Sequence, residues 1–155
     1  MPSIKTISDN VSVSGWLDEE DFAKVRALGF DKVINFRPDN EAPDQISSAE
    51  AEAAAHDAGL EYVQIPVTRN DLFTDKVVSR ASREFATGGR VLAYCASSQR
   101  AAIVWAAATA RTLPVDDVLS SLRAGGFDLR LIRDDLEAQA DRGRWLKDET
   151  TGATA

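Results

Sequence analysis

One stretch of the sequence decides the fold, and it reads Val91-Leu92-Ala93-Tyr94-Cys95-Ala96-Ser97-Ser98-Gln99-Arg100. Its first four residues have the pattern of a short buried strand, a cysteine follows at once, and a helix-forming segment begins within five residues. A small polar turn between a strand and a helix directs several backbone N–H groups toward one point at the helix N-terminus. The stretch therefore predicts a strand, an anion-binding loop and a helix in direct succession.

The segments on either side of this stretch alternate between strand and helix patterns. We expect further strands at residues 11–14, 32–36 and 60–65, and helices at residues 18–28, 47–58, 74–86, 99–111, 116–124 and 129–140. Strands that alternate with helices of about 11 residues are typical of βαβ units. The sequence thus predicts an α/β fold with a mostly parallel central sheet of about four or five strands and with helices on both faces.

Length and composition favour one domain. A chain of 155 residues, of which 44% are hydrophobic and 28% charged, is ordinary for a single globular domain. Such a chain can bury a sizeable core without disulfides or metals. We place the domain at residues 1–147, because the last stretch, Asp148–Ala155, is small and polar and is expected to be a disordered tail.

The charge balance and the cysteine count argue against several classes of function. A total of 18 basic and 25 acidic residues gives a net charge of −7, which disfavours nucleic acid or an anionic membrane surface as a partner. The longest apolar run, Ala101–Ala108, is too short to span a membrane. No secretory signal is visible, so we expect a cytoplasmic location. With one cysteine and one histidine, we expect no disulfide, no protein-bound metal and no cofactor.

The predicted loop offers the parts of a nucleophilic anion site. The positive helix N-terminus favours the thiolate form of Cys95, and Arg100 can present two parallel N–H donors to a tetrahedral anion. Four residues between them would ring the substrate with donors: Ala96, Ser97, Ser98 and Gln99. The alternative interpretation is that Cys95 is a small buried apolar residue.

Two other loops follow strands that should lie parallel to the strand before Cys95. All three loops should therefore open at one edge of the sheet. The loop at residues 37–45 begins with Arg37, which is a candidate second clamp for the anion. The alternative is an exposed arginine paired with Asp39 or Asp44.

The chain resembles the beta-lactamase hydrolase-like phosphatase family, a bacterial group within the cysteine-phosphatase superfold, some of whose members are described as sulfurtransferases. The resemblance extends over about residues 4–124 and is carried by the stretches Val13–Gly15, Val33–Asp39, Gly59–Val67 and Val91–Cys95. It implies a three-layer cysteine-phosphatase-like fold and a chemistry that begins at Cys95.

The same resemblance gives Asp71 a candidate role. In cysteine phosphatases a carboxylic acid on a neighbouring loop protonates the leaving alcohol, and Asp71 lies in the loop at residues 66–73. Asp75 is a weaker candidate for this acid. The alternative is an aspartate that structures the loop or caps a helix.

The cysteine loop departs from the family pattern, which usually reads Cys-Arg-Ser-Gly-Thr-Arg-Ser. Here Ala96 replaces an arginine, so that one positive charge beside the thiol is lost. Ser98 replaces a glycine and must adopt whatever backbone conformation the glycine served. Ala101 replaces a hydroxyl that, in related phosphatases, helps the cysteine to leave the phospho-enzyme. The last change predicts slow phosphatase turnover.

Three classes of function follow, and the sequence ranks a sulfurtransferase first. Four residues separate Cys95 from Arg100, as is common in rhodanese sulfurtransferases, whereas protein-tyrosine phosphatases have five. The shorter ring suits a persulfide sulfur that is carried on Cys95 and passed to a thiol acceptor. The alternative is a cysteine phosphatase with a phospho-cysteine intermediate and Asp71 as its acid. The third class is a non-catalytic anion-binding or interaction module, and the oligomeric state is left open.

Overall fold

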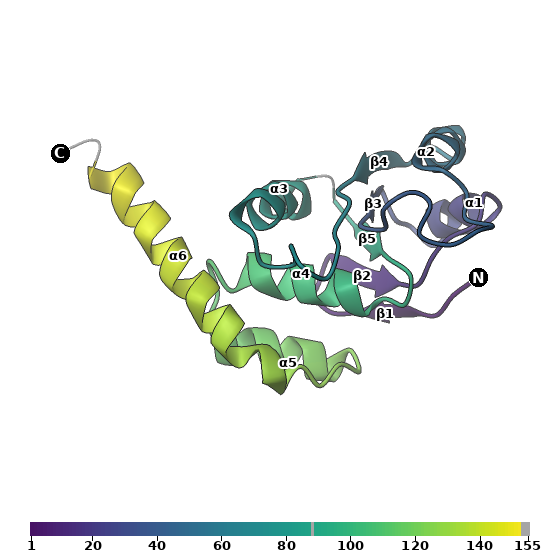
Figure 1. Ribbon diagram of the computed structural model, residues 1–155. Coiled ribbons are helices and arrows are strands. Elements are labelled where there is room, and N and C mark those ends of the chain that lie inside the picture. The colour runs from purple at the N-terminus through teal and green to yellow at the C-terminus, as the bar shows by residue number, and fades with distance from the viewer. Residues whose placement is uncertain (88, 153–155) are drawn as a thin grey trace.

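The chain forms three layers, with helices on either side of a central sheet (Figure 1). The computed structural model describes residues 1–87 and 89–152. Its strands are β1 (Ile4–Thr6), β2 (Val11–Ser14), β3 (Lys32–Asn35), β4 (Glu61–Gln64) and β5 (Val91–Tyr94). Its helices are α1 (Asp21–Ala27), α2 (Ser48–Asp57), α3 (Asp75–Ala86), α4 (Gln99–Thr109), α5 (Val115–Ala124) and α6 (Arg133–Gly152), with a 3₁₀ turn at Arg130–Ile132. None of these helices, as far as the described residues go, is long and apolar enough to cross a membrane.

The sheet has the predicted, mostly parallel arrangement. Within the described residues its five strands lie in the order β1-β2-β5-β3-β4. All neighbours pair in parallel except β1, which runs antiparallel to β2. Because the carboxyl ends of parallel strands meet at one edge, the loops after β3, β4 and β5 open together there.

Helices cover both faces of the sheet, as predicted. In β5, Val91 and Ala93 pack into an apolar cluster with α3, α4 and α5, whereas Leu92 and Tyr94 pack into a second cluster with α1 and α2. Successive side chains of a strand point to opposite faces. A strand that is buried on both faces therefore needs an unbroken apolar run, which is the pattern of this strand in the sequence.

The C-terminal part differs most from the expectation. The helix predicted at residues 129–140 begins at Arg133, after the 3₁₀ turn, and continues to Gly152 as α6. The tail expected at residues 148–155 thus starts as helix through residue 152, and residues 153–155 lie outside the described part of the chain. A Cβ at Gly143 would overlap the Arg111 carbonyl oxygen, so the glycine lets α6 pack directly on the end of α4. Beyond that contact α6 extends away from the sheet (Figure 1).

Smaller differences lie at the N-terminal edge. The sequence pattern did not predict β1, which has only three residues and is partly exposed, so that it is too short for a period of two to be visible. Helix α1 begins at Asp21 rather than at Asp18. The Asp21 side chain accepts a hydrogen bond from the Asp18 backbone N–H at 2.9 Å, which keeps residues 18–20 as a turn ahead of the helix.

Candidate active site

The three loops predicted to open together do meet at one cavity. It has a volume of about 450 Å³ and is lined by residues of all three loops and of the first turns of α4: Glu41, Thr68, Arg69, Leu72, Ser97, Gln99, Arg100 and Ile103. Of the predicted site residues, Ser97, Gln99 and Arg100 line this cavity directly. Ala96 instead borders a separate hollow beside Gly15 and Trp16.

Cys95 lies directly after β5, at the edge where the loops converge. Its backbone N–H donates to the Ser14 carbonyl oxygen at 3.4 Å. The side chain has no exposed surface and packs in the apolar cluster on the α4 face of the sheet. The position at the strand end agrees with the predicted nucleophile, whereas the burial agrees with the alternative of a small apolar residue. A substrate can reach this thiol only after a local rearrangement that exposes it.

The loop above Cys95 is held in a tight turn. Ser97 forms an isolated bridge with Gly15, and a Cβ at Gly15 would come within 3.1 Å of the Ala96 carbonyl oxygen. Ser98 is buried, precedes the first residue of α4 and has a φ of 78°. This is the left-handed region that favours glycine. At the position where the family pattern has glycine, this serine therefore holds a conformation that glycine adopts more easily.

Arg100 is held by Glu41, a residue that the sequence analysis did not single out. The two terminal nitrogens of the guanidinium donate to the two Glu41 carboxylate oxygens at 2.9 and 3.0 Å. Nη1 also donates to the Val67 carbonyl oxygen at 2.8 Å. Among the described residues no acceptor pairs with Nε of Arg100. The guanidinium is thus fixed by a bidentate ion pair that leaves its Nε–H, and one N–H of Nη2, for a ligand.

Arg37 belongs to the same group of charges. Its side chain is mostly buried, and its Nε donates to Glu41 Oε1 at 3.3 Å. The Arg37 backbone N–H donates to Asn35 Oδ1 at 2.8 Å, which fixes the chain as it leaves β3. Glu41 therefore joins Arg37 to Arg100, whereas the pairing of Arg37 with Asp39 or Asp44 that we considered is not the one found. A glutamate four residues after Arg37 in a polar loop was the only sequence signal for this role.

The two candidate acids have different surroundings. Asp71 Oδ1 accepts hydrogen bonds from the Thr68 backbone N–H at 2.6 Å and the Thr68 hydroxyl at 3.1 Å. This side chain therefore structures its loop, and its Oδ2 has no hydrogen-bond partner in residues 1–87 and 89–152. Asp75 instead pairs with Arg111 at 2.7 Å and Arg142 at 2.9 Å, which makes it an unsuitable acid. No group of three or more His, Cys, Asp or Glu side chains in the described chain is arranged to hold a metal ion.

The charges at this edge stabilise one another. The hydrogen bonds from Arg100, with a smaller contribution from Arg37, hold the pKa of Glu41 below its ordinary value. Glu41 in turn raises the pKa of Arg100, Cys95 and Asp71 add smaller contributions in the same direction, and burial opposes the rise. Cys95 and Asp71 are therefore both close enough to interact electrostatically with Arg100.

Comparison with known sequences gives matches over most of the chain. A family model described as "Beta-lactamase hydrolase-like protein, phosphatase-like domain" matches residues 3–112. A beta-lactamase hydrolase-like protein of Xylella fastidiosa is 33% identical over 140 residues, which are 88% of this chain and 32% of that protein. The chain thus spans about a third of the length of the curated relatives it matches.

Comparison with solved structures supports the same fold. A candidate phosphatase from Neisseria meningitidis superposes with a TM-score of 0.76 at 26% identity, over 88% of this chain and 97% of that chain. A kinase-associated phosphatase, solved with its catalytic-site cysteine replaced by serine, has a TM-score of 0.69 at 13% identity, over 93% and 96% of the two chains. The predicted cysteine-phosphatase-like three-layer fold is confirmed.

Proposed function

The chain belongs to the phosphatase-like domain family of the beta-lactamase hydrolase-like proteins, and from this premise we propose that it is a cysteine-dependent phosphatase for a small phosphate monoester. The observation that carries the proposal is the succession of Cys95 at the end of β5 and Arg100 in the first turn of α4, at the edge where three loops form one cavity. The likeness to the Neisseria meningitidis protein supports the same chemistry.

The proposed reaction has two steps at Cys95. The thiolate attacks phosphorus, an S–P bond forms, and the P–O bond to the leaving group breaks. The leaving oxygen takes a proton from Asp71, whose Oδ2 is the oxygen not used by the Thr68 turn. In the second step Asp71 accepts a proton from water, the water oxygen attacks phosphorus, and the S–P bond breaks to return the thiolate and release phosphate.

Arg100 is proposed to bind the phosphoryl oxygens through Nε, together with the backbone N–H groups at the start of α4. Glu41 holds the two terminal nitrogens in place, so the guanidinium does not have to find its orientation when the substrate arrives. Preorganised donors of this kind stabilise charge in the transition state more than mobile ones do. Glu41 is therefore a positioning residue, and Arg37 supports it from the β3 loop.

Two features of this chain should slow the reaction. Residue 101 is alanine, so the hydroxyl expected to help the thiolate leave the phospho-enzyme is absent. Cys95 is buried in the resting structure, so its surroundings have to rearrange before the thiol can attack. The missing hydroxyl acts on the second step, so phospho-Cys95 enzyme accumulates with abundant substrate when that step is slower than the attack of the thiolate.

A sulfurtransferase is the second candidate, although the sequence ranked it first. The family match and the likeness to a candidate phosphatase support the phosphatase alternative better. The observation that still favours sulfur transfer is the spacing of four residues between Cys95 and Arg100. In that reaction the thiolate would take a sulfane sulfur as a persulfide and pass it to a thiol acceptor, while Asp71 would have no role.

Intact mass spectrometry separates the candidates. The protein is incubated with p-nitrophenyl phosphate or with thiosulfate, quenched in acid and digested to locate the modified residue. The phosphatase proposal predicts a gain of about 80 Da on Cys95 with the aryl phosphate. A gain of about 32 Da with thiosulfate, and none with the aryl phosphate, would establish sulfur transfer instead.

Cys95→Ser is the matched control, because serine has nearly the same shape and is a far weaker nucleophile at neutral pH. It should give neither mass gain under the same conditions. If the wild type also gives neither, and releases no p-nitrophenolate, the chain is a non-catalytic anion-binding module.

A further inference from the structure

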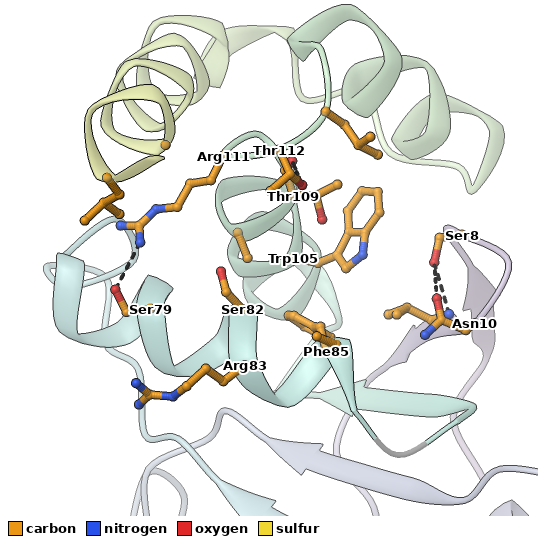
Figure 2. A pocket seen from close by; sticks show the side chains of 16 residues that line it. Ser8, Asn10, Ser79, Ser82, Arg83, Phe85, Trp105, Thr109, Arg111 and Thr112 are labelled. Carbon is orange, nitrogen blue, oxygen red and sulfur yellow. Dashed lines mark hydrogen bonds between the residues drawn. The ribbon is translucent and has the colours of Figure 1, made fainter. Parts of the chain in front are cut away.

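A second, larger cavity lies away from the candidate active site (Figure 2). It has a volume of about 600 Å³ and is bounded by α3, the second half of α4, α6 and the chain around the start of β2. None of its lining residues belongs to the cavity of the candidate active site. Its volume is in the range of pockets that hold small organic molecules.

The wall of this cavity is mainly apolar and partly aromatic. Trp105 of α4 lies at its centre in Figure 2, and Phe85 of α3 forms the floor. Val11, Leu113 and Leu146 contribute further apolar surface from three other segments. Aromatic and aliphatic walls of this kind favour a flat apolar ligand over a hydrated polar one.

Two polar groups in this wall lack partners among the described residues. The Ser82 hydroxyl oxygen is buried and makes no hydrogen bond, and Figure 2 shows it pointing toward the interior of the cavity. The indole N–H of Trp105 also donates to no described residue, but unlike the Ser82 oxygen this nitrogen keeps some solvent-accessible surface. A buried polar group without a partner costs free energy that a ligand atom can recover.

The charged groups around the cavity are directed elsewhere. Arg111 donates to Gln139, Ser79 and Asp75 at 2.9, 3.0 and 2.7 Å, so its charge is paired with an aspartate within the protein. Figure 2 shows the Arg83 guanidinium pointing away from the cavity. The inner surface therefore offers hydrogen bonds without a net charge.

We propose that this cavity is a binding site for an uncharged, flat and mostly apolar small molecule with one carbonyl or hydroxyl oxygen. Its ring system would stack against Trp105 and Phe85, and its oxygen would bond to the Ser82 hydroxyl, the Trp105 N–H or both. The site is independent of the proposed phosphatase reaction, because it uses neither Cys95 nor Arg100.

Three naphthalenes of one shape test the ligand class: 2-acetylnaphthalene has an acceptor, 2-isopropylnaphthalene lacks it, and 2-naphthoate adds a charge. Each is titrated into the ¹⁵N-labelled 155-residue chain while the indole N–H signals are followed by NMR, with the Trp105 signal assigned from Trp105→Phe. The acetyl compound should shift the Trp105 signal and bind about fivefold more tightly than either of the others. The signal of Trp16, which does not line this cavity, should not move.

Two substitutions at Ser82 test the site itself. Ser82→Leu should fill the cavity and reduce binding of the acetyl compound at least about tenfold, whereas Ser120→Leu, the same change at an exposed position of α5, should not. Ser82→Ala should lower the affinity for the acetyl compound about threefold and leave that for the isopropyl compound unchanged. An unmoved Trp105 signal with all three probes, tighter binding of the naphthoate, or equal binding to wild type and Ser82→Leu would overturn the proposal.

Discussion

Helix α4 has an arginine at each end, and the structure holds the two in different ways. Arg100 lies in the first turn, and its two terminal nitrogens donate hydrogen bonds to the Glu41 carboxylate and the Val67 carbonyl oxygen. Its Nε has no partner among the described residues. Arg111 follows the last turn and uses Nε, Nη1 and Nη2 on three acceptors, which are Gln139, Ser79 and Asp75. The exposed fraction of the side chain is 21% for Arg100 and 7% for Arg111.

The difference shows how an arginine that stabilises the fold can be told from one that binds a ligand. Both lie at helix ends and both pair with a carboxylate, so charge alone does not separate them. Arg111 spreads its hydrogen bonds over all three guanidinium nitrogens and its side chain is almost fully buried, so it is poorly placed to meet a substrate. Arg100 is equally well oriented, but its Nε is unpaired among the described residues, its side chain is more exposed, and it lines the cavity where the three loops meet. The predictions below change one end of α4 and use the other as the reference.

The largest effect is expected for Arg100→Lys. Lysine keeps the charge but loses the planar fork that pairs with Glu41 and presents Nε, so kcat/KM for p-nitrophenyl phosphate should fall about 100-fold or more. Arg111→Lys, the same change at the other end, should stay within about twofold of wild type. Steady-state kinetics of the two variants measure this. Equal losses in both would mean that the comparison between the two arginines says nothing about catalysis.

For stability the two lysine variants should rank in the opposite order, with the larger loss in Arg111→Lys. Arg111→Lys leaves three acceptors for a side chain that cannot reach them all, and we expect the free energy of unfolding to fall by about 2 kcal/mol. Arg100→Lys, at the more exposed end, should lower it by less than about 1 kcal/mol. Urea denaturation of both variants with a common slope gives the two values. A larger loss for Arg100→Lys would show that its ion pair with Glu41 is mainly structural.

Glu41→Gln should lower kcat/KM about tenfold at neutral pH. Glutamine keeps the shape but removes the charge that makes the bidentate pair with Arg100 strong. The loss should fall mainly on kcat, because the change misorients a group that acts in the transition state. If Glu41 instead competed with the substrate for Arg100, the variant would be more active than wild type, which would contradict the positioning role.

The same variant should also change the acid limb of the stability curve. The folded-state pKa of Glu41 lies below its ordinary value of 4.5 because of the hydrogen bonds from Arg100. A lowered carboxyl pKa contributes stability that is complete above the ordinary value and is lost as the pH falls through the folded value. The wild type should therefore lose its advantage over Glu41→Gln at acid pH. The urea unfolding midpoints of wild type and Glu41→Gln, measured between about pH 6 and pH 3, test this expectation.

The fold was largely predictable because its signals are local. The apolar run of β5, the capping box of Ser47 and Glu50 and the helix start after Cys95 each act within a few residues. The sequence did not predict the short edge strand β1 or the full length of α6. α6 has a polar composition and packs on α4 through a glycine, Gly143, and a close approach of that kind leaves no periodic pattern.

The candidate site was predictable in its place but not in its contacts. The rule for parallel strands brought Arg37, Asp71 and Cys95 to one edge. It could not reveal that Glu41 pairs with Arg100, because those residues are 59 positions apart and their contact depends on how two loops fold over the edge. It also could not decide whether Cys95 is open or covered, since that depends on the conformation of Ser98 and its neighbours.

The smallest effect concerns the backbone at the N-terminal end of α4. Ser98 has a φ of 78° and its side chain makes no capping hydrogen bond, so nothing offsets the left-handed conformation. Ser98→Gly should raise the free energy of unfolding by about 0.5–1 kcal/mol, which is the cost of that conformation less the entropy that glycine loses on folding. Asn40, the other non-glycine residue with positive φ in residues 1–87 and 89–152, has a φ of 62°. Because asparagine tolerates this region, Asn40→Gly should change stability by less than about 0.3 kcal/mol. Urea denaturation of the two variants measures both changes. If the free energy of unfolding rose no more for Ser98→Gly than for Asn40→Gly, the backbone at Ser98 would be unstrained, and the loop after Cys95 would hold no strain that a rearrangement could release.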